Sequence, residues 1–254
     1  MIDRRSPNYK EYNWKFMTLD ENHNGFQYVN GLNINNGDGS GDNMVFTTGN
    51  YIFSIFDENF VFIRQIDVPI GARVVNSKTY DHAYESDKLS LGKRLDLRNV
   101  DTWEILWDNF IEMMTFKEKI LYVLSRNGWL KPLIWFVDKI RDIHENDSTV
   151  LGEVLKGAIS NNNVDVIEYI LKEYPDNISS LGSNGSIMSS IAELAVNPNK
   201  QPDYCFPTMK TLIDHNLFES VNRNIVLLPN AIMFRAMNHT ETYKLIQSYI
   251  DKDK

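Results

Sequence analysis

The sequence is poor in the residues that build disulfides and metal sites. Cys205 is its only cysteine among 254 residues, so no disulfide can form within the chain and no cysteine-based zinc site is available. The five histidines are scattered, and no pair of them has the i, i+4 spacing of a helical metal site. We therefore expect an ordinary semi-buried thiol, no metal site and no cofactor.

Long apolar runs are also missing. The first ten residues contain no apolar core of signal-peptide length, and no later stretch approaches the roughly eighteen apolar residues that a membrane span requires. Acidic residues outnumber basic ones and give a net charge of −8, which argues against a general phosphate-binding surface. These absences predict a soluble, non-secreted chain that binds neither membranes nor, directly, nucleic acid.

The residues that are present suit a folded protein of one or two domains, with 43% hydrophobic and 24% charged residues. From Tyr12 to Lys93, short alternating runs rich in β-branched and aromatic residues are broken by turns, a pattern typical of strands. The predicted strands are 14–17, 25–29, 44–47, 60–68, 72–75 and 88–91, with one or two helical turns at 50–56 and a flexible loop at 35–42. The N-terminal half is therefore predicted to be a small, mainly β module.

The hydrophobic period changes at Asp101. This residue offers a helix N-cap with Glu104 three residues on, and Trp103, Leu106 and Phe110 fall on one helical face. We place the domain boundary near Arg94 to Asn99, which divides the chain into residues 1–98 and 99–254.

Beyond this boundary the sequence repeats itself. Residues 115–140 can be laid over 149–174 without a gap, so that Leu124 matches Ala158 at a spacing of 34 residues. Each unit has two helical stretches joined by a polar turn, and each exposes an apolar stripe that only a neighbouring unit can cover. An ordinary helical bundle with recurring helix lengths is the alternative.

Two further units follow with weaker registration. A third begins near Ile191, carries a long turn from Asn197 to Pro207 and resumes at Met209, and a fourth runs from Ala231 through His239 to Ile250. A regular repeat does not need so long a turn, which makes 197–207 a region of functional interest.

Residues 155–171 resemble the core of an ankyrin repeat, although the Thr-Pro-Leu-His opening of a consensus repeat is absent from every unit. The N-terminal half is similar to the module that precedes the repeats in ankyrin-repeat proteins of giant DNA viruses of the mimivirus kind, most specifically in residues 25–33. The chain departs from that family at the loop 37–42, where the family often has a cysteine and a Gly-Gly-Leu-Tyr-Phe-Thr run. The resemblance implies an α+β protein in which a small β module precedes a degenerate ankyrin-like helical array.

The repeats predict a non-catalytic adaptor or scaffold, and the resemblance implies that it belongs to a giant virus and binds a viral or host protein, in the host cytoplasm or in the virion. The tips and turns of successive units are the expected contact residues. They are Asn127, Trp129, Asn161, Asn162, Asn163, Asn199 and His239.

Two other functions remain open. The N-terminal module could be an enzyme with a nucleotide pocket of ADP-ribosyltransferase type around His23, Tyr28 and Asn33, but the glutamate motif of such transferases is missing. The simpler interpretation is structural: His23 is a turn residue and Tyr28 is an aromatic residue of the core. The chain could also be a subunit of a viral assembly, in which case salt-dependent RNA binding would be expected.

Overall fold

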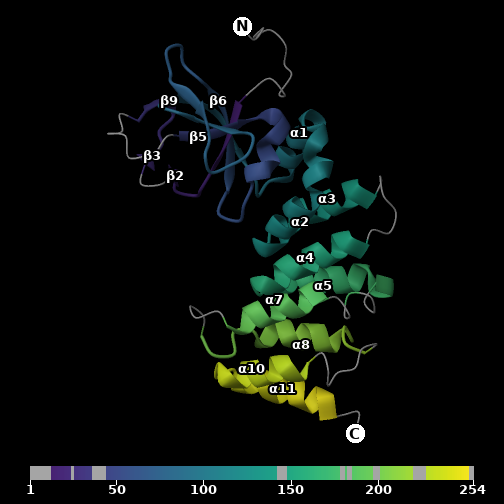
Figure 1. Ribbon diagram of the computed structural model, residues 1–254. Coiled ribbons are helices and arrows are strands. Elements are labelled where there is room, and N and C mark those ends of the chain that lie inside the picture. Colours follow the sequence, from purple (N-terminus) through teal and green to yellow (C-terminus); the bar gives the residue numbers. More distant parts are fainter. Residues whose placement is uncertain are drawn as a thin grey trace. The chain divides into compact units, whose positions relative to one another are not determined.

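The structure is a computed structural model that describes residues 13–23, 26–35, 44–141, 148–177, 181, 185–196, 201–219 and 227–251. The chain forms two compact units, residues 1–120 and 121–254 (Figure 1). The predicted boundary between residues 98 and 99 falls where the last strand gives way to helix α1 (Val100–Asn109). Helix α1 and the 3-10 helix η3 (Ile111–Phe116) are grouped with the strands in the first unit.

The first unit is built on a seven-stranded sheet in the order β4-β9-β6-β1-β5-β8-β7, with a separate two-stranded sheet of β2 and β3. All described strand pairs are antiparallel. The strands are β1 (Asn13–Met17), β2 (Asn22–His23), β3 (Phe26–Gln27), β4 (Gly31–Ile34), β5 (Met44–Thr48), β6 (Phe62–Asp67), β7 (Val74–Asn76), β8 (Ala83–Ser86) and β9 (Lys88–Asp96).

Alternation along β1 builds a core on each face of this sheet. Met17 lies in a cluster with Tyr28, Phe46 and other buried residues on one face. Because successive side chains of a strand point to opposite faces, Trp14 and Phe16 pack on the other one. There they pack against four other aromatic residues. Phe53 belongs to the 3-10 helix η2 (Gly49–Ile55) and Phe56 follows it, whereas Trp103 belongs to α1 and Phe110 precedes η3.

Several strand predictions are confirmed, including 14–17, 44–47 and 60–68. The predicted helical turns at 50–56 are confirmed as η2. The run 88–91 is the first part of a longer strand, β9, and the run 72–75 is shifted to β7. The pattern gave no indication of β4 and β8. In β4 the usual alternation is inverted, because Asn33 is buried while Leu32 and Ile34 are exposed, and in β8 two of the four residues are polar.

The second unit consists of helix pairs that follow one another along the chain (Figure 1). The described pairs are α2 (Lys117–Arg126) with α3 (Leu130–Arg141), α4 (Ser148–Ser160) with α5 (Val164–Glu173), α7 (Gly185–Ala195) with α8 (Phe206–Asp214), and α10 (Leu228–Ala236) with α11 (Thr240–Asp251). First helices pack on first helices, from α4 to α7 to α10, and second helices on second helices, from α5 to α8 to α11. The predicted α+β fold with four helix pairs is confirmed.

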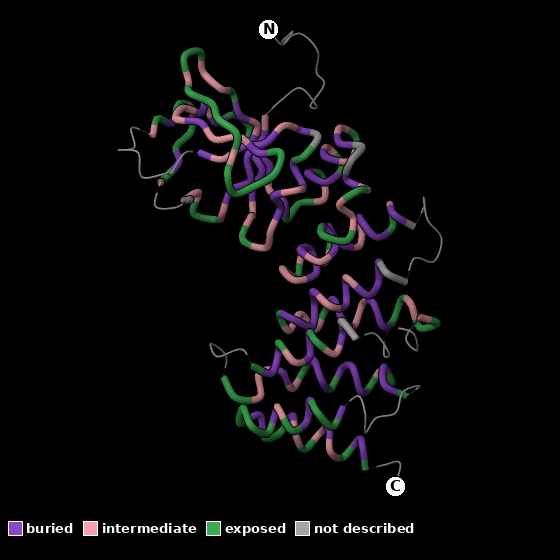
Figure 2. The backbone as a smooth tube through the Cα atoms, viewed as in Figure 1, coloured by how far each residue is buried: buried purple, intermediate pink, exposed green. Residues whose placement is uncertain are grey.

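Burial follows the same repeat. Leu121 and Leu124 of α2 are buried, as are Leu155 and Ala158 at the matching positions of α4. Figure 2 shows buried residues recurring along each helix of the described pairs. Each helix therefore hides its apolar stripe against its own partner helix and its neighbours, as the 34-residue spacing predicts.

Helices α2, α4, α8 and α10 end in the same turn. In each case one residue has positive φ, namely Gly128, Asn162, Asn216 and Asn238. The N–H of that residue donates to the carbonyl three residues back, and the next N–H donates to the carbonyl five residues back, as in Asn162 to Ile159 and Asn163 to Ala158. This is the Schellman motif, in which glycine or asparagine adopts the left-handed conformation at little cost.

Candidate functional site

In two of these turns the residue after the left-handed position links its helix pair to the preceding pair. In the α4–α5 turn this residue is Asn163, whose Nδ2 donates to the carbonyls of Ser125 at 2.8 Å and Arg126 at 2.6 Å, at the end of α2. The last four carbonyls of a helix have no partner within the helix. The Asn163 side chain therefore both satisfies these carbonyls and joins the two pairs.

His239 occupies the same place in the α10–α11 turn and makes the corresponding contact. Its Nδ1 accepts a hydrogen bond from the N–H of Asp203 at 2.7 Å, so the neutral ring carries its proton on Nε2, which lies 3.1 Å from the carbonyl of Ala195 at the end of α7. Only 4% of His239 is exposed. Its ring joins the fourth helix pair to the third.

Asp203 and Asn162 extend this set of contacts. Asp203 Oδ1 accepts hydrogen bonds from the N–H of Thr242, in the first turn of α11, at 3.0 Å and from its hydroxyl at 3.1 Å. Burial opposes ionisation of Asp203, but the hydrogen bonds that its carboxylate accepts outweigh it and lower the pKa of Asp203. Asn162 donates to the carbonyl of Tyr204 and accepts from the hydroxyl of Thr208 at 2.6 Å. The turns thus hold the α7–α8 pair from both sides.

Cys205 lies in the same region. Its thiol is buried and unpaired by any disulfide, its Sγ is 3.5 Å from Thr242 Oγ1, and burial raises its pKa. The thiol is a packing group of the helix stack.

The other predicted contact residues lie nearer the surface. Asn161 is exposed and donates to the carbonyl of Arg126 at 2.9 Å. Trp129 is half-buried between α2 and α3, at the position that Asn163 and His239 hold in later pairs. Asn127 is half-buried too, and its Nδ2 has no hydrogen-bond partner among the described residues. Asn199 lies outside the described residues.

The alternative site in the first unit is held together by its own side chains. Tyr28 is 4% exposed and belongs to the sheet core. The side chain of Asn33 bonds both the N–H and the carbonyl of Val29 at 2.8 Å. The side chain of His23 lies outside the described part of the chain.

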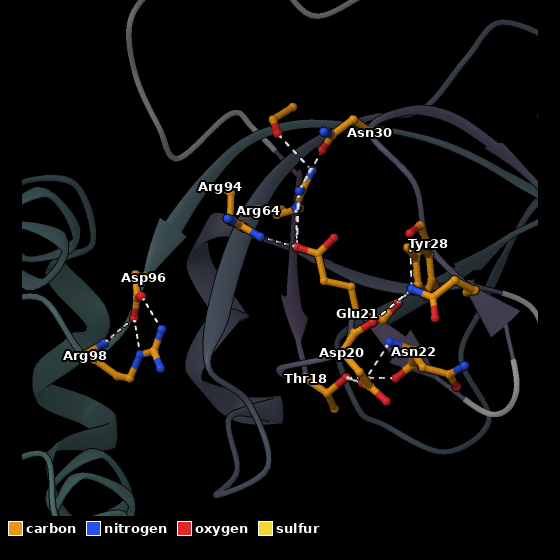
Figure 3. A network of polar contacts seen from close by, with 12 residues as sticks. Thr18, Asp20, Glu21, Asn22, Tyr28, Asn30, Arg64, Arg94, Asp96 and Arg98 are labelled. Atoms are coloured by element: carbon orange, nitrogen blue, oxygen red, sulfur yellow. Dashed lines mark hydrogen bonds and ion pairs between the residues drawn. The ribbon is translucent and has the colours of Figure 1, made fainter.

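Buried Arg64 anchors the same segment to the sheet (Figure 3). Its Nη2 lies 3.1 Å from Glu21 Oε1 and donates to Asn30 Oδ1 at 2.8 Å. Arg94 lies 3.4 Å from the same Glu21 oxygen. A buried arginine needs such a carboxylate and amide to offset its desolvation, so this network holds Glu21 and Asn30 against β6.

Lys15 is the most unusual group of the first unit. It is 2% exposed, its Nζ donates to the Val45 carbonyl at 2.8 Å, and it lies 4.8 Å from the centre of the Tyr28 ring. Strands β1 and β5 pair only at Asn13 and Trp14, so the amine fills the gap where the two strands separate. Burial lowers the pKa of Lys15 to about 7.

Comparisons with known proteins support the viral resemblance. Two proteins of Acanthamoeba polyphaga mimivirus, both named as putative ankyrin repeat proteins, are similar to the chain. One is 25% identical over 108 residues, which cover 42% of this chain and 24% of that protein. The other is 27% identical over 175 residues, which cover 63% of this chain and 82% of that protein.

This chain resembles mimivirus ankyrin repeat proteins. The resemblance predicted from the sequence is thereby confirmed. The match spans only about a quarter of the first relative's length. No family model matches the chain, and no solved structure matches it.

The ankyrin-like unit also has exposed apolar residues that the sequence did not single out. Among its described residues the large exposed hydrophobics are Val196 at 44%, Leu228 at 38%, Ile232 at 60% and Met237 at 41%. Three of them belong to α10 and its turn, and Val196 follows α7, the helix on which α10 packs. In the sequence they look like ordinary members of the helical apolar stripe, so only the structure separates them from the core.

The described residues contain no group of three or more histidine, cysteine, aspartate or glutamate residues that could hold a metal ion. Within the same part of the chain, no helix has the length and hydrophobicity needed to span a membrane.

Proposed function

We propose that this chain is a non-catalytic adaptor or scaffold that binds a viral or host protein through its ankyrin-like helix pairs. The observation that carries the proposal is the group of exposed apolar residues on the third and fourth pairs, on a stack whose turns are clamped by buried hydrogen bonds. Contiguous exposed apolar patches mark interaction sites, and these four residues come from α10, the turn after it and the residue that follows the neighbouring helix α7. The similarity to viral ankyrin repeat proteins agrees with this role.

The turn residues along the helix stack have two proposed roles. Asn127, Trp129 and Asn161 reach the surface and are proposed to contact the partner, as is Asn199. The other group of turn residues connects successive helix pairs and affects binding indirectly, by fixing the shape of the stack. This group is Asn162, Asn163 and His239. A rigid stack binds with less loss of conformational entropy than a flexible one.

Ile232 and Met237 are the proposed hydrophobic contacts. Full burial of one such side chain from an exposed state contributes about 1.5–3 kcal/mol. Because Ile232 is 60% and Met237 41% exposed, burying both can supply about 1.5–3 kcal/mol of a micromolar affinity of about 8 kcal/mol. We propose that binding takes place in the host cytoplasm or in the virion.

Affinity purification from infected cells, followed by quantitative mass spectrometry, tests the proposal. The double variant Ile232→Glu with Met237→Glu should reduce recovery of the main partner at least about tenfold, because two charges enter the contact. The matched control is Leu19→Glu, which places a charge at a residue of the first unit that is 65% exposed.

Undiminished recovery by the double variant, with its helical content intact, would rule out this surface. The enzyme alternative is tested in parallel by His23→Ala and Tyr28→Phe. An adaptor keeps its partner when these residues are replaced.

A further inference from the structure

Strand β7 is the last strand of the sheet, and one of its edges has no partner strand among the described residues. It pairs with β8 on one side only, through Val74–Ser86, Val75–Glu85 and Asn76–Tyr84. The whole of this region, from residue 44 to residue 141, is described. The opposite edge strand, β4, runs on into residues outside the described part.

The hydrogen bonds around β7 show which backbone groups point outward. The N–H of Asp87 donates to the Arg73 carbonyl, and the N–H of Ser77 donates to the Ala83 carbonyl. In an antiparallel ladder, bonded residues alternate with residues whose groups face away. The N–H and carbonyl groups of Val74 and Asn76 therefore point to the outer edge.

The side chains around this edge are apolar and exposed on both faces of the strand. Val74 is 42% exposed and Val75 is 44% exposed. Ile70, in the loop before β7, is 99% exposed, and Tyr80 after it is 36% exposed. An added strand would cover part of this surface, which is the gain that peptide addition to a sheet edge requires.

A positively charged side chain lies at each end of β7. Arg73 precedes β7 and Lys78 follows it closely, and both are exposed. The nearby acids Glu85 and Asp87 accept hydrogen bonds from the backbone N–H groups of Lys78 and Arg73. Antiparallel pairing between two copies of β7 would gather four cations along one ribbon, which like-charge repulsion opposes. The charges instead complement an acidic peptide.

We propose that the outer edge of β7 binds an extended peptide segment whose apolar centre is flanked by acidic residues, as an eighth strand of the sheet. Val74 and Asn76 supply the backbone hydrogen bonds, Val74 and Val75 contact the apolar centre, and Arg73 and Lys78 pair with the acids. This surface belongs to the first unit and is independent of the binding proposed for the helix pairs. It gives the scaffold a second attachment point.

Fluorescence polarisation with the full chain and a labelled probe tests the proposal. The probe is Gly-Ser-Asp-Glu-Ile-Val-Ile-Val-Glu-Asp-Ser-Gly. Saturable binding is expected. Asn76→Pro should weaken it at least about tenfold, because proline removes an outward N–H without removing a bond to β8. The matched control Asn76→Ala keeps the N–H and should bind like the wild type.

Two more measurements keep the test independent of any effect on folding. Two probes are methylated on alternate peptide nitrogens, one on the even and one on the odd positions. Only the probe whose methyl groups replace the N–H groups that face β7 should lose binding, and the protein itself is not altered. The double variant Arg73→Glu with Lys78→Glu should prefer a probe with lysines in place of the acids by about tenfold or more.

Cations on edge strands also discourage aggregation, and the outcomes separate that role from binding. No saturable binding at millimolar probe, equal binding after alternate methylation, or self-association through β7 that Asn76→Pro removes would each overturn the proposal.

Discussion

At the scale of single residues, the turns explain why this irregular array stays in register. Asn163 and His239 occupy equivalent positions and reach back to carbonyls at the end of the previous first helix. Because each bond crosses from one pair to the next, it contributes to the interface and not only to its own turn. A buried polar group of this kind costs more to remove than a surface one.

Asn163→Ala should lower the free energy of unfolding by about 1–3 kcal/mol, because it leaves the Ser125 and Arg126 carbonyls with fewer donors. The matched control is Asn161→Ala, which removes a single exposed bond two residues away and should cost less than about 1 kcal/mol. Urea denaturation followed by circular dichroism measures both. Equal losses of unfolding free energy in the two variants would show that the Asn163 bonds between helix pairs contribute no more than the exposed Asn161 bond.

Lys15 makes the stability of the first unit depend on pH. Its pKa is about 7 in the folded chain, against 10.5 for an ordinary lysine such as it becomes on unfolding. Below pH 7 the amine is protonated in both states, so the full cost of burying the charge is present. As pH rises from 7 to 10.5 the folded chain loses this proton first, so the free energy of unfolding rises, by at most about 5 kcal/mol.

Lys15→Met should therefore stabilise the protein at pH 7, by roughly 1–3 kcal/mol after the loss of the bond to Val45. It should also flatten the rise between pH 7 and 10. Lys93→Met, at an exposed site on β9, serves as the control and should change neither. The account of Lys15 is wrong if Lys15→Met unfolds more easily than the wild type at both pH values.

The sequence predicted where the turn residues lie, but the structure shows what several of them do. An asparagine after a helix looks the same whether it binds a partner or adopts a left-handed turn. Asn162 has positive φ and two hydrogen bonds to the α7–α8 pair. Its role depends on residues more than 40 positions away, and no local pattern contains them.

At the scale of helices and strands, Gly157 determines how closely α4 approaches α2. A Cβ atom at this position would lie 2.2 Å from Ser125 Oγ and 2.5 Å from the Tyr122 carbonyl oxygen. The second of these atoms belongs to the backbone and cannot swing aside. The glycine is therefore required by packing, although glycine is a poor helix former.

Gly157→Ala gives a prediction whose sign is decisive. Helix propensity alone would stabilise α4 by about 1 kcal/mol, whereas the clash should destabilise the protein by about 1–3 kcal/mol. Thermal unfolding of the variant distinguishes the two. A raised melting temperature would mean that α4 and α2 are not packed this closely.

Strand prediction succeeded where the sequence has an apolar run and failed where polar residues interrupt the pattern, as in β4 and β8. The predicted runs 14–17 and 60–68 are apolar over most of their length and coincide with most of β1 and with β6. Strand β4 was missed because it exposes Leu32 and Ile34 and buries Asn33, whose amide holds the preceding turn. A single sequence cannot show that a polar residue is buried for this reason.

At the scale of the whole molecule, the chain combines an antiparallel sheet unit with a stack of ankyrin-like helix pairs. The period of 34 residues was enough to predict the stack, because each pair needs a neighbour to bury its stripe. The exposed apolar residues of α10 could not be predicted in the same way. Whether Ile232 is core or surface depends on which neighbour covers it, and periodicity does not contain that information.

The measurement that tests the adaptor account most directly is hydrogen exchange of the full chain with and without the partner recovered from infected cells. The account predicts slower exchange on binding in residues 187–196 and 228–239, with Ile232→Glu together with Met237→Glu abolishing the effect. Slower exchange confined to residues 13–120, with the helix pairs unchanged, would contradict it.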